Sequence, residues 1–451
     1  MRRYLLATSG HPNYGDELIT AAWLRHLARR FPDDEVVLDS PQAGGTAALH
    51  GDLHPRLRCV DTVFRVAEEA GSHDPWQVAA FVRGAVHDHG AAPRWAAGLR
   101  LLEGADVVHV LGGGWVNAMW PLNTAALAAG SVLADEGRHV ALTGAGLMPA
   151  EPSTAPLLRR LLRGYAVVDV RDEPTRALLE GLSATRLSGD DALLALDDAP
   201  SGVPGGGHSG GPGDGAGAAG GPWAPPEGLP PTMLCVQSDV VAPEDLPALA
   251  ALVLDQLDRW GVRGEELGVL ECVPRVDRWV WDAVVAPHLP GARFLSLGEV
   301  LDRGFPARPG QRWLTTRYHP HLLAAARGAS GVAVDVAPDY YGHKHRALQA
   351  LGSPFEVRAL RPAAGAPLPA PAAPAGAGWD LSGPVRDKHR LAEQVHAAPD
   401  AAPHVAPHVD GHRQDDDRRE DHRHDDHRGT GHGADRSAGL GGRLRDLRGR
   451  R

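Results

Sequence analysis

Short apolar runs alternate with helical patterns along most of the chain, and several of these runs end in glycine. In the first half the runs lie at residues 4–7, 35–38, 106–111, 139–143 and 166–170. Gly112-Gly113-Gly114 follows the third run, and Gly144-Ala145-Gly146 follows the fourth. Strands that alternate with helices usually pair in parallel, with helices covering both faces of the sheet. We therefore predict a doubly wound, Rossmann-like α/β domain over residues 1–196.

The same alternation resumes in the second half of the chain. Apolar runs near 233–236, 268–273, 312–316 and 332–335 predict a second Rossmann-like domain over 232–361. The Gly/Pro-rich residues between the two, 197–231, are predicted to be a flexible linker. Ligands of such sheets bind at the carboxyl ends of the strands, so we expect the site in a cleft between the domains.

The last part of the chain, 362–451, is first Pro/Ala-rich and then rich in His, Asp and Arg. We expect this segment to be a disordered tail, because it lacks the apolar content for a core. Its histidines show no fixed spacing of metal ligands, so we expect a solvated tail rather than a metal store.

Charge and cysteine content exclude several classes of protein. The net charge of −10 argues against nucleic-acid binding, which needs a basic face. Cys59, Cys235 and Cys272 form no C-x-x-C pair, which argues against a disulfide framework or a thiolate zinc site and fits a reducing cytosol. No apolar run approaches the roughly 18 residues of a membrane helix. We therefore expect a cytoplasmic protein without a bound metal or other cofactor.

The chain contains 46 lysine and arginine residues in total. Two of them, Lys344 and Lys388, are lysines, and all the others are arginines. Asparagine occurs only at Asn13, Asn117 and Asn123. Lysine and asparagine have AT-rich codons, so a gene under pressure toward GC loses them unless another residue cannot replace them. The alternative is that these lysines and asparagines were kept by chance. The bias therefore indicates a functional role only for those that fall within motifs.

The first motif, at residues 11–19, lies between a predicted strand and a predicted helix. Asn13 and Asp16 are good helix caps, which is one interpretation. The other is that Asn13, Gly15 and Asp16 form a helix N-terminus whose free N–H groups bind an anion or sugar hydroxyls.

Two further strand ends are candidates. Gly112, Gly113 and Gly114 allow a close approach of backbone to ligand, with Asn117 just beyond them, although a tight turn without a ligand has the same sequence. Arg171 ends another strand, where it pairs either with a neighbouring acid or with a carboxylate or phosphate of a ligand.

Arg317 and His319 form the most informative candidate, after a strand that ends in Thr315-Thr316. If the segment is extended, residues two apart share a face, so the guanidinium and the imidazole point the same way. That pair suits an anionic substrate that also needs proton transfer, whereas a capping or stacking histidine is the alternative. Lys344, after the next strand, adds a compact positive charge.

Six short motifs in order resemble the polysaccharide pyruvyl transferase family. They are N-Y-G-D-E-L (13–18), L-G-G-G (111–114), V-R-D (170–172), S-G-D-D (188–191), T-R-Y-H (316–319) and Y-G-H-K (341–344). The resemblance covers about residues 1–355. It implies a GT-B-like fold and transfer of a pyruvyl group from phosphoenolpyruvate to a sugar as a ketal, with Arg171, Arg317 and His319 in the phosphoenolpyruvate site.

The residue chemistry agrees with what the resemblance implies. Arginine forks pair with the carboxylate and phosphate of phosphoenolpyruvate, and histidine is the residue type best suited to acid–base work at neutral pH, which favours His319 for that role. We expect His319, Arg317 and Asp16 to be catalytic, with Asp16 or its neighbour Glu17 accepting the proton of a sugar hydroxyl. The expected partners are phosphoenolpyruvate and a glycan or lipid-linked glycan, which would bring the protein only to the periphery of a membrane. The expected substrate-binding residues are Arg171, Lys344, Asn13, Gly15, Gly112, Gly113, Gly114 and Asn117.

Two other functions are compatible with this sequence. One is a GT-B glycosyltransferase that uses a nucleotide sugar, although no clear acidic partner for a ribose is present. The other is a non-catalytic glycan-binding relative, against which the presence of both Arg317 and His319 argues.

Overall fold

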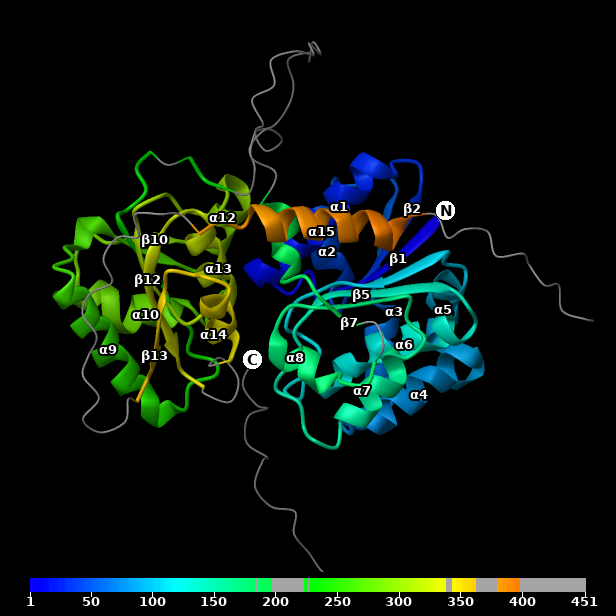
Figure 1. Ribbon diagram of the computed structural model, residues 1–451. Coiled ribbons are helices and arrows are strands. Elements are labelled where there is room, and N and C mark those ends of the chain that lie inside the picture. Colours follow the sequence, from blue (N-terminus) through cyan, green and yellow to red (C-terminus); the bar gives the residue numbers. More distant parts are fainter. Residues whose placement is uncertain (183–184, 197–222, 226, 338–342, 362–378, 398–451) are drawn as a thin grey trace, which may run out of the picture. The chain divides into compact units, whose positions relative to one another are not determined.

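The computed structural model describes residues 1–182, 185–196, 223–225, 227–337, 343–361 and 379–397, and it contains two parallel sheets (Figure 1). The first sheet has seven strands in the order β3-β2-β1-β4-β5-β6-β7. In chain order they are β1 (Arg2–Leu6), β2 (Glu35–Asp39), β3 (Leu57–Val60), β4 (Val107–Val110), β5 (His139–Ala145), β6 (Val167–Val170) and β7 (Thr185–Leu187). The order reverses beside β1, so the loops after β1 and β4 diverge at the point where such sheets bind ligands.

The second sheet repeats this arrangement with six strands in the order β10-β9-β8-β11-β12-β13. Its strands are β8 (Thr232–Cys235), β9 (Leu267–Leu270), β10 (Arg293–Leu295), β11 (Arg312–Thr315), β12 (Ser330–Asp335) and β13 (Glu356–Ala359). Every residue of β4, β6, β8, β9 and β12 is buried, as expected of parallel strands covered on both faces. Here the order reverses beside β8.

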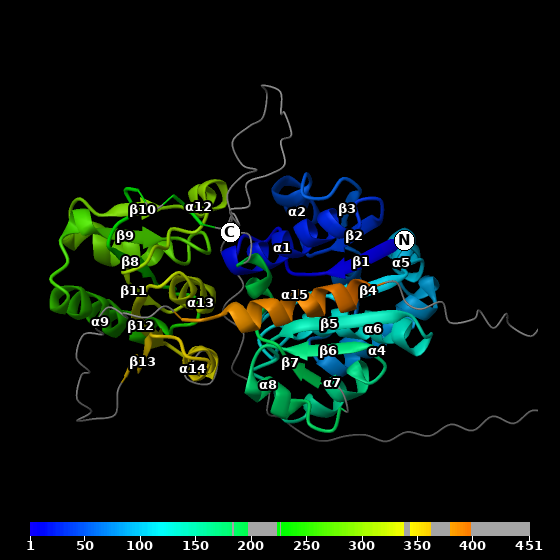
Figure 2. The same cartoon turned by 45° about the horizontal axis from the view of Figure 1, so that its top comes forward.

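Helices cover both faces of the first sheet (Figure 2). One face packs against the helices α3 (Thr62–Glu69), α4 (Pro75–His87), α5 (Ala96–Glu103), α6 (Thr124–Asp135) and α7 (Ala155–Leu162). On the other face α1 (Tyr14–Arg30) packs on Leu5 and Leu38, and α15 (Ser382–His396) packs on Ala141 and Val167. The short helices α2 (Ala43–His50) and α8 (Glu173–Leu178) complete this part.

The second sheet is also covered on both faces. On one face lie α9 (Leu246–Arg259) and a helical segment made of α10 (Arg278–Val280), a π-helical turn (Trp281–Val285) and α11 (Ala286–His288). On the other lie α12 (Leu297–Arg303), α13 (Tyr318–Ala326) and α14 (His343–Ala350). The predicted α/β class and its two Rossmann-like sheets are confirmed, and this is the two-sheet organisation of a GT-B-like fold.

The C-terminal segment differs from the predicted tail. Residues 379–397 fold, and the helix α15 lies along the first sheet (Figures 1 and 2). Leu391 and Val395 are buried there, and Lys388 is fully buried. The tail prediction was wrong for these residues, because α15 has an apolar stripe at helical spacing that the surrounding polar composition obscured. Residues 362–378 and 398–451 lie outside the described part.

The predicted linker also ends earlier than expected. Ala224 N–H donates to Phe305 O (3.0 Å), and Arg312 N–H donates to Pro231 O (2.9 Å). The second part of the fold therefore includes Trp223 and Ala224, whereas residues 197–222 of the predicted linker lie outside the described part.

Candidate active site

The N-terminus of α1 carries the first predicted motif. Asn13 caps the helix, since its Oδ1 accepts from Gly15 N–H (3.3 Å) and its Nδ2 donates to Asp16 Oδ2 (2.9 Å). Tyr14 N–H donates to Cys272 O (3.0 Å), which lies beyond β9. Burial raises the pKa of Asp16 to about 6, although nearby His319 opposes the rise. The capping interpretation is therefore confirmed for Asn13, whereas Asp16 lies in the first turn of the helix and places a carboxyl of raised pKa near an imidazole.

His319 lies against the first turn of α1. A Cβ on Gly15 would overlap the His319 ring, so only glycine at position 15 allows this approach. The Nε2 atom of His319 is 3.4 Å from Asp190 Oδ1, in the range of an ion pair when the imidazole is protonated. Asp190 precedes the short 3-10 helix at Asp191–Ala195. A histidine from α13 thus reaches both the α1 N-terminus and the segment after β7.

Arg171 directly follows β6 and is held by the same carboxylate. Its Nη1 donates to Asp190 Oδ2 (3.0 Å), and its guanidinium carbon lies 4.4 Å from the centroid of the Tyr318 ring. Burial by itself would raise the pKa of Asp190, but His319 and Arg171 hold it well below the ordinary value. A Cβ on Gly114 would lie 2.7 Å from Nη2 of Arg171, and one on Gly146 would overlap the guanidinium. Glycine at the ends of β4 and β5 therefore makes room for Arg171.

Lys344 borders the same glycine as Arg171. It is 4% exposed, and a Cβ on Gly114 would lie 3.3 Å from its Nζ. Burial, and then the like charge of Arg171, lower the pKa of Lys344 well below its ordinary value. An anionic ligand bound here would favour the charged form of Lys344, because it would offset the repulsion from Arg171 and the desolvation.

The glycine loop after β4 is held from both sides. Gly112 N–H donates to Asp191 Oδ2 (3.0 Å), and Gly113 has φ +118°, a conformation that side chains disfavour. Asn117 Nδ2 donates to Gly114 O (2.7 Å), and its Oδ1 accepts from Met119 N–H (2.9 Å). These hydrogen bonds hold the loop in one conformation, and Asn117 makes two of them.

Arg317 has different partners from those of His319. Its Nε donates to Asp277 Oδ1 (2.7 Å), its Nη2 lies 2.7 Å from the same oxygen, and Asp239 Oδ1 is 3.7 Å from Nη2. The prediction that Arg317 and His319 share a face was wrong, because the segment is not extended. Arg317 is the N-cap of α13, and the helix begins at Tyr318.

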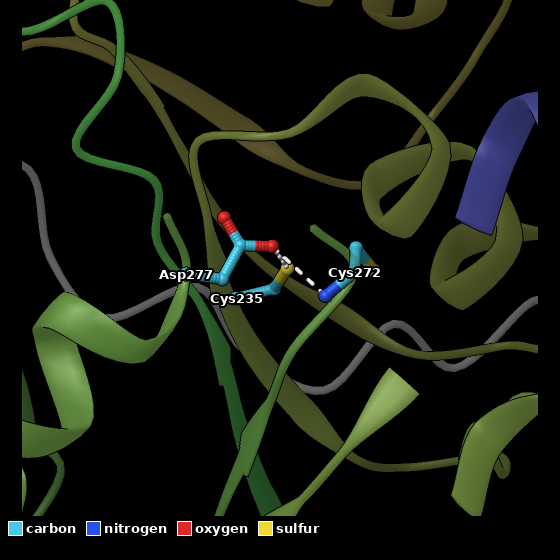
Figure 3. Close-up of side chains that lie close together, drawn as sticks. All are labelled: Cys235, Cys272 and Asp277. Atoms are coloured by element: carbon cyan, nitrogen blue, oxygen red, sulfur yellow. Dashed lines mark hydrogen bonds between the residues drawn. The ribbon is translucent and has the colours of Figure 1, made fainter. Parts of the chain in front are cut away.

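The Arg317 partner Asp277 belongs to a buried group with Cys235 and Cys272 (Figure 3). Their potential ligand atoms lie within 4.8 Å of one another. Asp277 Oδ2 already accepts from Cys272 N–H (2.8 Å) and Val273 N–H (2.9 Å), and burial followed by Cys272 raises the pKa of the Cys235 thiol. A saturated carboxylate and a protonated thiol make a poor metal site, so the group serves as an anchor for Arg317.

The site thus consists of side chains from separate motifs around Asp190. The sequence profile of polysaccharide pyruvyl transferases matches residues 13–244, more than half of the chain. The chain belongs to the polysaccharide pyruvyl transferase family. Membership of this family makes the protein a transferase.

Several solved structures have a distant similarity to this chain. A putative UDP-N-acetylglucosamine 2-epimerase from Listeria monocytogenes has 12% identity and a TM-score of 0.46, with 88% of this chain and 91% of that chain covered. The UDP-GlcNAc 2-epimerase from Methanocaldococcus jannaschii has 10% identity and a TM-score of 0.43, with coverage of 80% and 89%. A spinosyn rhamnosyltransferase has 15% identity and a TM-score of 0.40, with coverage of 88% and 97%.

No significant match was found among curated proteins. Across the described parts of this family member, none of the helices has the length and apolar character needed to cross a bilayer.

Sequence reasoning missed four residues of the site in this family member. Asp190 and Asp191 lay within the recognised S-G-D-D motif but were given no role, and Tyr318 lay between the two candidates that drew attention. Lys388 was assigned to the tail, although it is one of the two lysines. The rarity of lysine in this chain was the signal that could have identified Lys388. In the Y-G-H-K motif, Tyr341 and Gly342 lie outside the described residues.

Proposed function

We propose that the chain transfers a pyruvyl group from phosphoenolpyruvate to two hydroxyls of one sugar in a cell-surface or cell-wall polysaccharide, forming a ketal. A proton adds to the methylene carbon, and the first hydroxyl oxygen bonds to the neighbouring carbon. The bond from that carbon to the phosphate oxygen then breaks, inorganic phosphate leaves, and the second hydroxyl oxygen takes its place. One hydroxyl proton replaces the proton given to the methylene carbon, and the other leaves with phosphate.

The burial of Arg171 and Lys344 beside Gly114 carries this proposal. Phosphoenolpyruvate has a carboxylate and a phosphate, and two cations with a rigid backbone between them suit both groups. Gly114 leaves room for Arg171 and Lys344 beside the donor, Asp191 holds Gly112, and Asn117 keeps the loop in place. Asn13 and Gly15 contribute the start of α1.

His319 and Asp16 take the proton-transfer roles in the proposal. His319 donates the proton to the methylene carbon, and Asp190 orients its ring from Nε2. Asp16, with a pKa raised to about 6 by burial, accepts a hydroxyl proton at neutral pH. His319 lies against Gly15 and Asp16 is the next residue in the chain, so a donor placed against Arg171 would have an acid and a base available.

Arg317 acts in this proposal through its pairing with Asp277. That pair fixes the start of α13, and hence the position of His319 two residues later. Arg317 reaches the donor only if it leaves this carboxylate. No bound cofactor enters the reaction, and we place it in the cytoplasm, where a lipid-linked glycan would be met at the membrane surface.

The test is the product that the purified chain releases. With phosphoenolpyruvate and a panel of methyl hexosides and N-acetylhexosaminides, we expect inorganic phosphate to appear only when a sugar is present. Arg171→Ala should abolish it. Release of nucleotide from nucleotide sugars, with none of phosphate from phosphoenolpyruvate, would instead establish the glycosyltransferase alternative. Glycan extracts of cells with and without the gene should differ in ketal-linked pyruvate.

A further inference from the structure

A cavity of about 370 Å³ lies beside the glycine loop and plays no part in the donor site. It is bordered by the start of α4, the loops after β4 and β5, and the start of α7. Val116, Leu147 and Leu158 are buried and give it an apolar floor, whereas Asp74, Glu151 and Ser153 are exposed at its edge. Its volume is at the lower end of the range of small-ligand sites, about 300–1,000 Å³.

An exposed tryptophan lines this cavity, and a second lies in one of the loops that border it. Trp76 lines it and is 39% exposed, and Trp120, between the lining residues Ala118 and Pro121, is 43% exposed. The indole of Trp76 is fixed, because its Nε1 donates to Ser153 O (3.1 Å). Large apolar side chains exposed together mark a binding surface. A fixed indole at the edge offers a flat platform without a cost in ordering it.

The charges of the lining select the class of ligand. Asp74 and Glu151 are the charged residues of the lining, with His73 beside them, and no arginine or lysine is among the described residues that line the cavity. This composition disfavours phosphates, nucleotides and anionic membrane surfaces. A sugar ring fits it, because its C–H face stacks on an indole while its hydroxyls donate to carboxylates.

One residue of the cavity wall is hydrogen-bonded to the glycine loop of the proposed donor site. Asn117 lines the cavity, and its Nδ2 donates to the carbonyl of Gly114, the glycine that borders Arg171 and Lys344. We propose that this cavity binds an uncharged pyranose ring of the acceptor glycan, next to the sugar that receives the pyruvyl group. The inference rests on the proposed function for its role, but the binding of sugar is testable without it.

The first measurement is binding alone. Saturation-transfer NMR with methyl hexosides and N-acetylhexosaminides, in the absence of phosphoenolpyruvate, should give signals from at least one glycoside. Trp76→Ala should remove these signals. The control is Trp281→Ala, which changes a half-buried tryptophan in the π-helical turn that covers the second sheet, and this variant should keep them. No signal with any glycoside, or equal signals from Trp76→Ala and wild type, would overturn the sugar site. Vesicle binding that depends on Trp76, without glycoside binding, would overturn it in favour of a membrane contact.

The second measurement is transfer. Trp76→Ala should raise the KM for the glycoside about tenfold or more, as loss of an aromatic anchor does, with the KM for phosphoenolpyruvate unchanged. Glu151→Gln should raise the glycoside KM as well. If wild type transfers and both variants keep its glycoside KM, the cavity assignment fails and the proposed function stands. If wild type never releases phosphate, the proposed function fails, and the NMR result alone decides the cavity.

Discussion

Asp190 links the two side chains that matter most in the candidate site, because Arg171 and His319 use its two oxygens. A carboxylate shared in this way fixes the distance between an anion-binding group and a proton donor. Gly15, Gly114 and Gly146 provide the space for these side chains, so backbone and side chains are fitted to each other. The roles of the individual residues separate in mutant kinetics.

His319 and Arg171 should fail in different ways. His319→Gln removes the proton donor, so kcat should fall by about 10²–10⁴ with the KM for phosphoenolpyruvate largely kept. Arg171→Lys keeps a charge but loses the fork, so the KM for phosphoenolpyruvate should rise. His288→Gln, an exposed histidine of α11, is the control. A normal kcat in His319→Gln with donor binding abolished would reduce His319 to a ligand contact.

The raised pKa of Asp16 sets the pH dependence. A general base works as the carboxylate, which predominates above its pKa of about 6 and is protonated below it. We therefore expect kcat to fall as the pH drops through about 6, and Asp16→Asn to be slow without that limb. A limb that persists in Asp16→Asn belongs to another group. Profiles of kcat between pH 5 and pH 8, a range that includes the Asp16 pKa of about 6, provide the measurement.

At the scale of elements, α15 joins the C-terminal end of the described chain to the first sheet. Lys388 is fully buried and donates to Asp169 Oδ2 (3.0 Å), Asp191 Oδ1 (3.0 Å) and Gly189 O (2.7 Å). Asp191 also accepts from Gly112 N–H, which begins the glycine loop. The helix therefore supports the site through a network, without touching the donor residues.

Lys388 should not be replaceable by arginine. The lysine ammonium has three N–H donors, and here each of them meets one acceptor. The planar guanidinium of arginine is larger and has five N–H donors, so it does not match these three acceptors. Lys388→Met leaves two buried carboxylates without their cation and should cost about 3–5 kcal/mol, with Lys388→Arg also destabilising. Arg386→Met, an exposed position of the same helix, is the matched control. The measurement is the free energy of unfolding of each variant, from denaturant titration. If Lys388→Arg were as stable as wild type, the rarity of lysine would no longer indicate that position 388 requires it.

The strands and the type of fold could be predicted from the sequence, because buried parallel strands and glycine-rich strand ends leave a local pattern. Side-chain contacts between residues that are far apart in the chain leave no such local pattern. The sequence shows that Arg317 and His319 lie two apart, but the start of α13 at Tyr318 sends them to different carboxylates. Likewise, α15 was hidden because its stripe of Leu391 and Val395 is short and lies between polar segments.

At the scale of the whole molecule, the fold extends to α15, beyond the second sheet. The apolar side chains of α15 bury against strands β5 and β6, at residues Ala141 and Val167. Residues after 397 have a polar composition with few apolar side chains. The boundary between what stabilises the fold and what does not is therefore expected directly after α15.

Two truncations test that boundary. Removal of residues 398–451 should leave the thermal midpoint and kcat unchanged, because this segment lacks the apolar content to join a core. Removal from 379 onward also deletes Leu391, Val395 and Lys388, and each buried aliphatic side chain alone is worth about 1.5–3 kcal/mol. This second truncation should lower the midpoint or aggregate. Loss of turnover in the first truncation would contradict the boundary, and wild-type behaviour of the second would contradict the role of α15.

The central claim is that a pyruvyl group is transferred from phosphoenolpyruvate, with its methylene carbon protonated from solvent through His319. The direct measurement is mass spectrometry and NMR of the sugar product after a reaction in D2O. We expect a glycoside that gains one pyruvate less one water, as a cyclic ketal whose methyl carries one deuterium, together with an equal amount of inorganic phosphate. An unaltered glycoside, or a product with a new glycosidic bond formed from a nucleotide sugar, would contradict it.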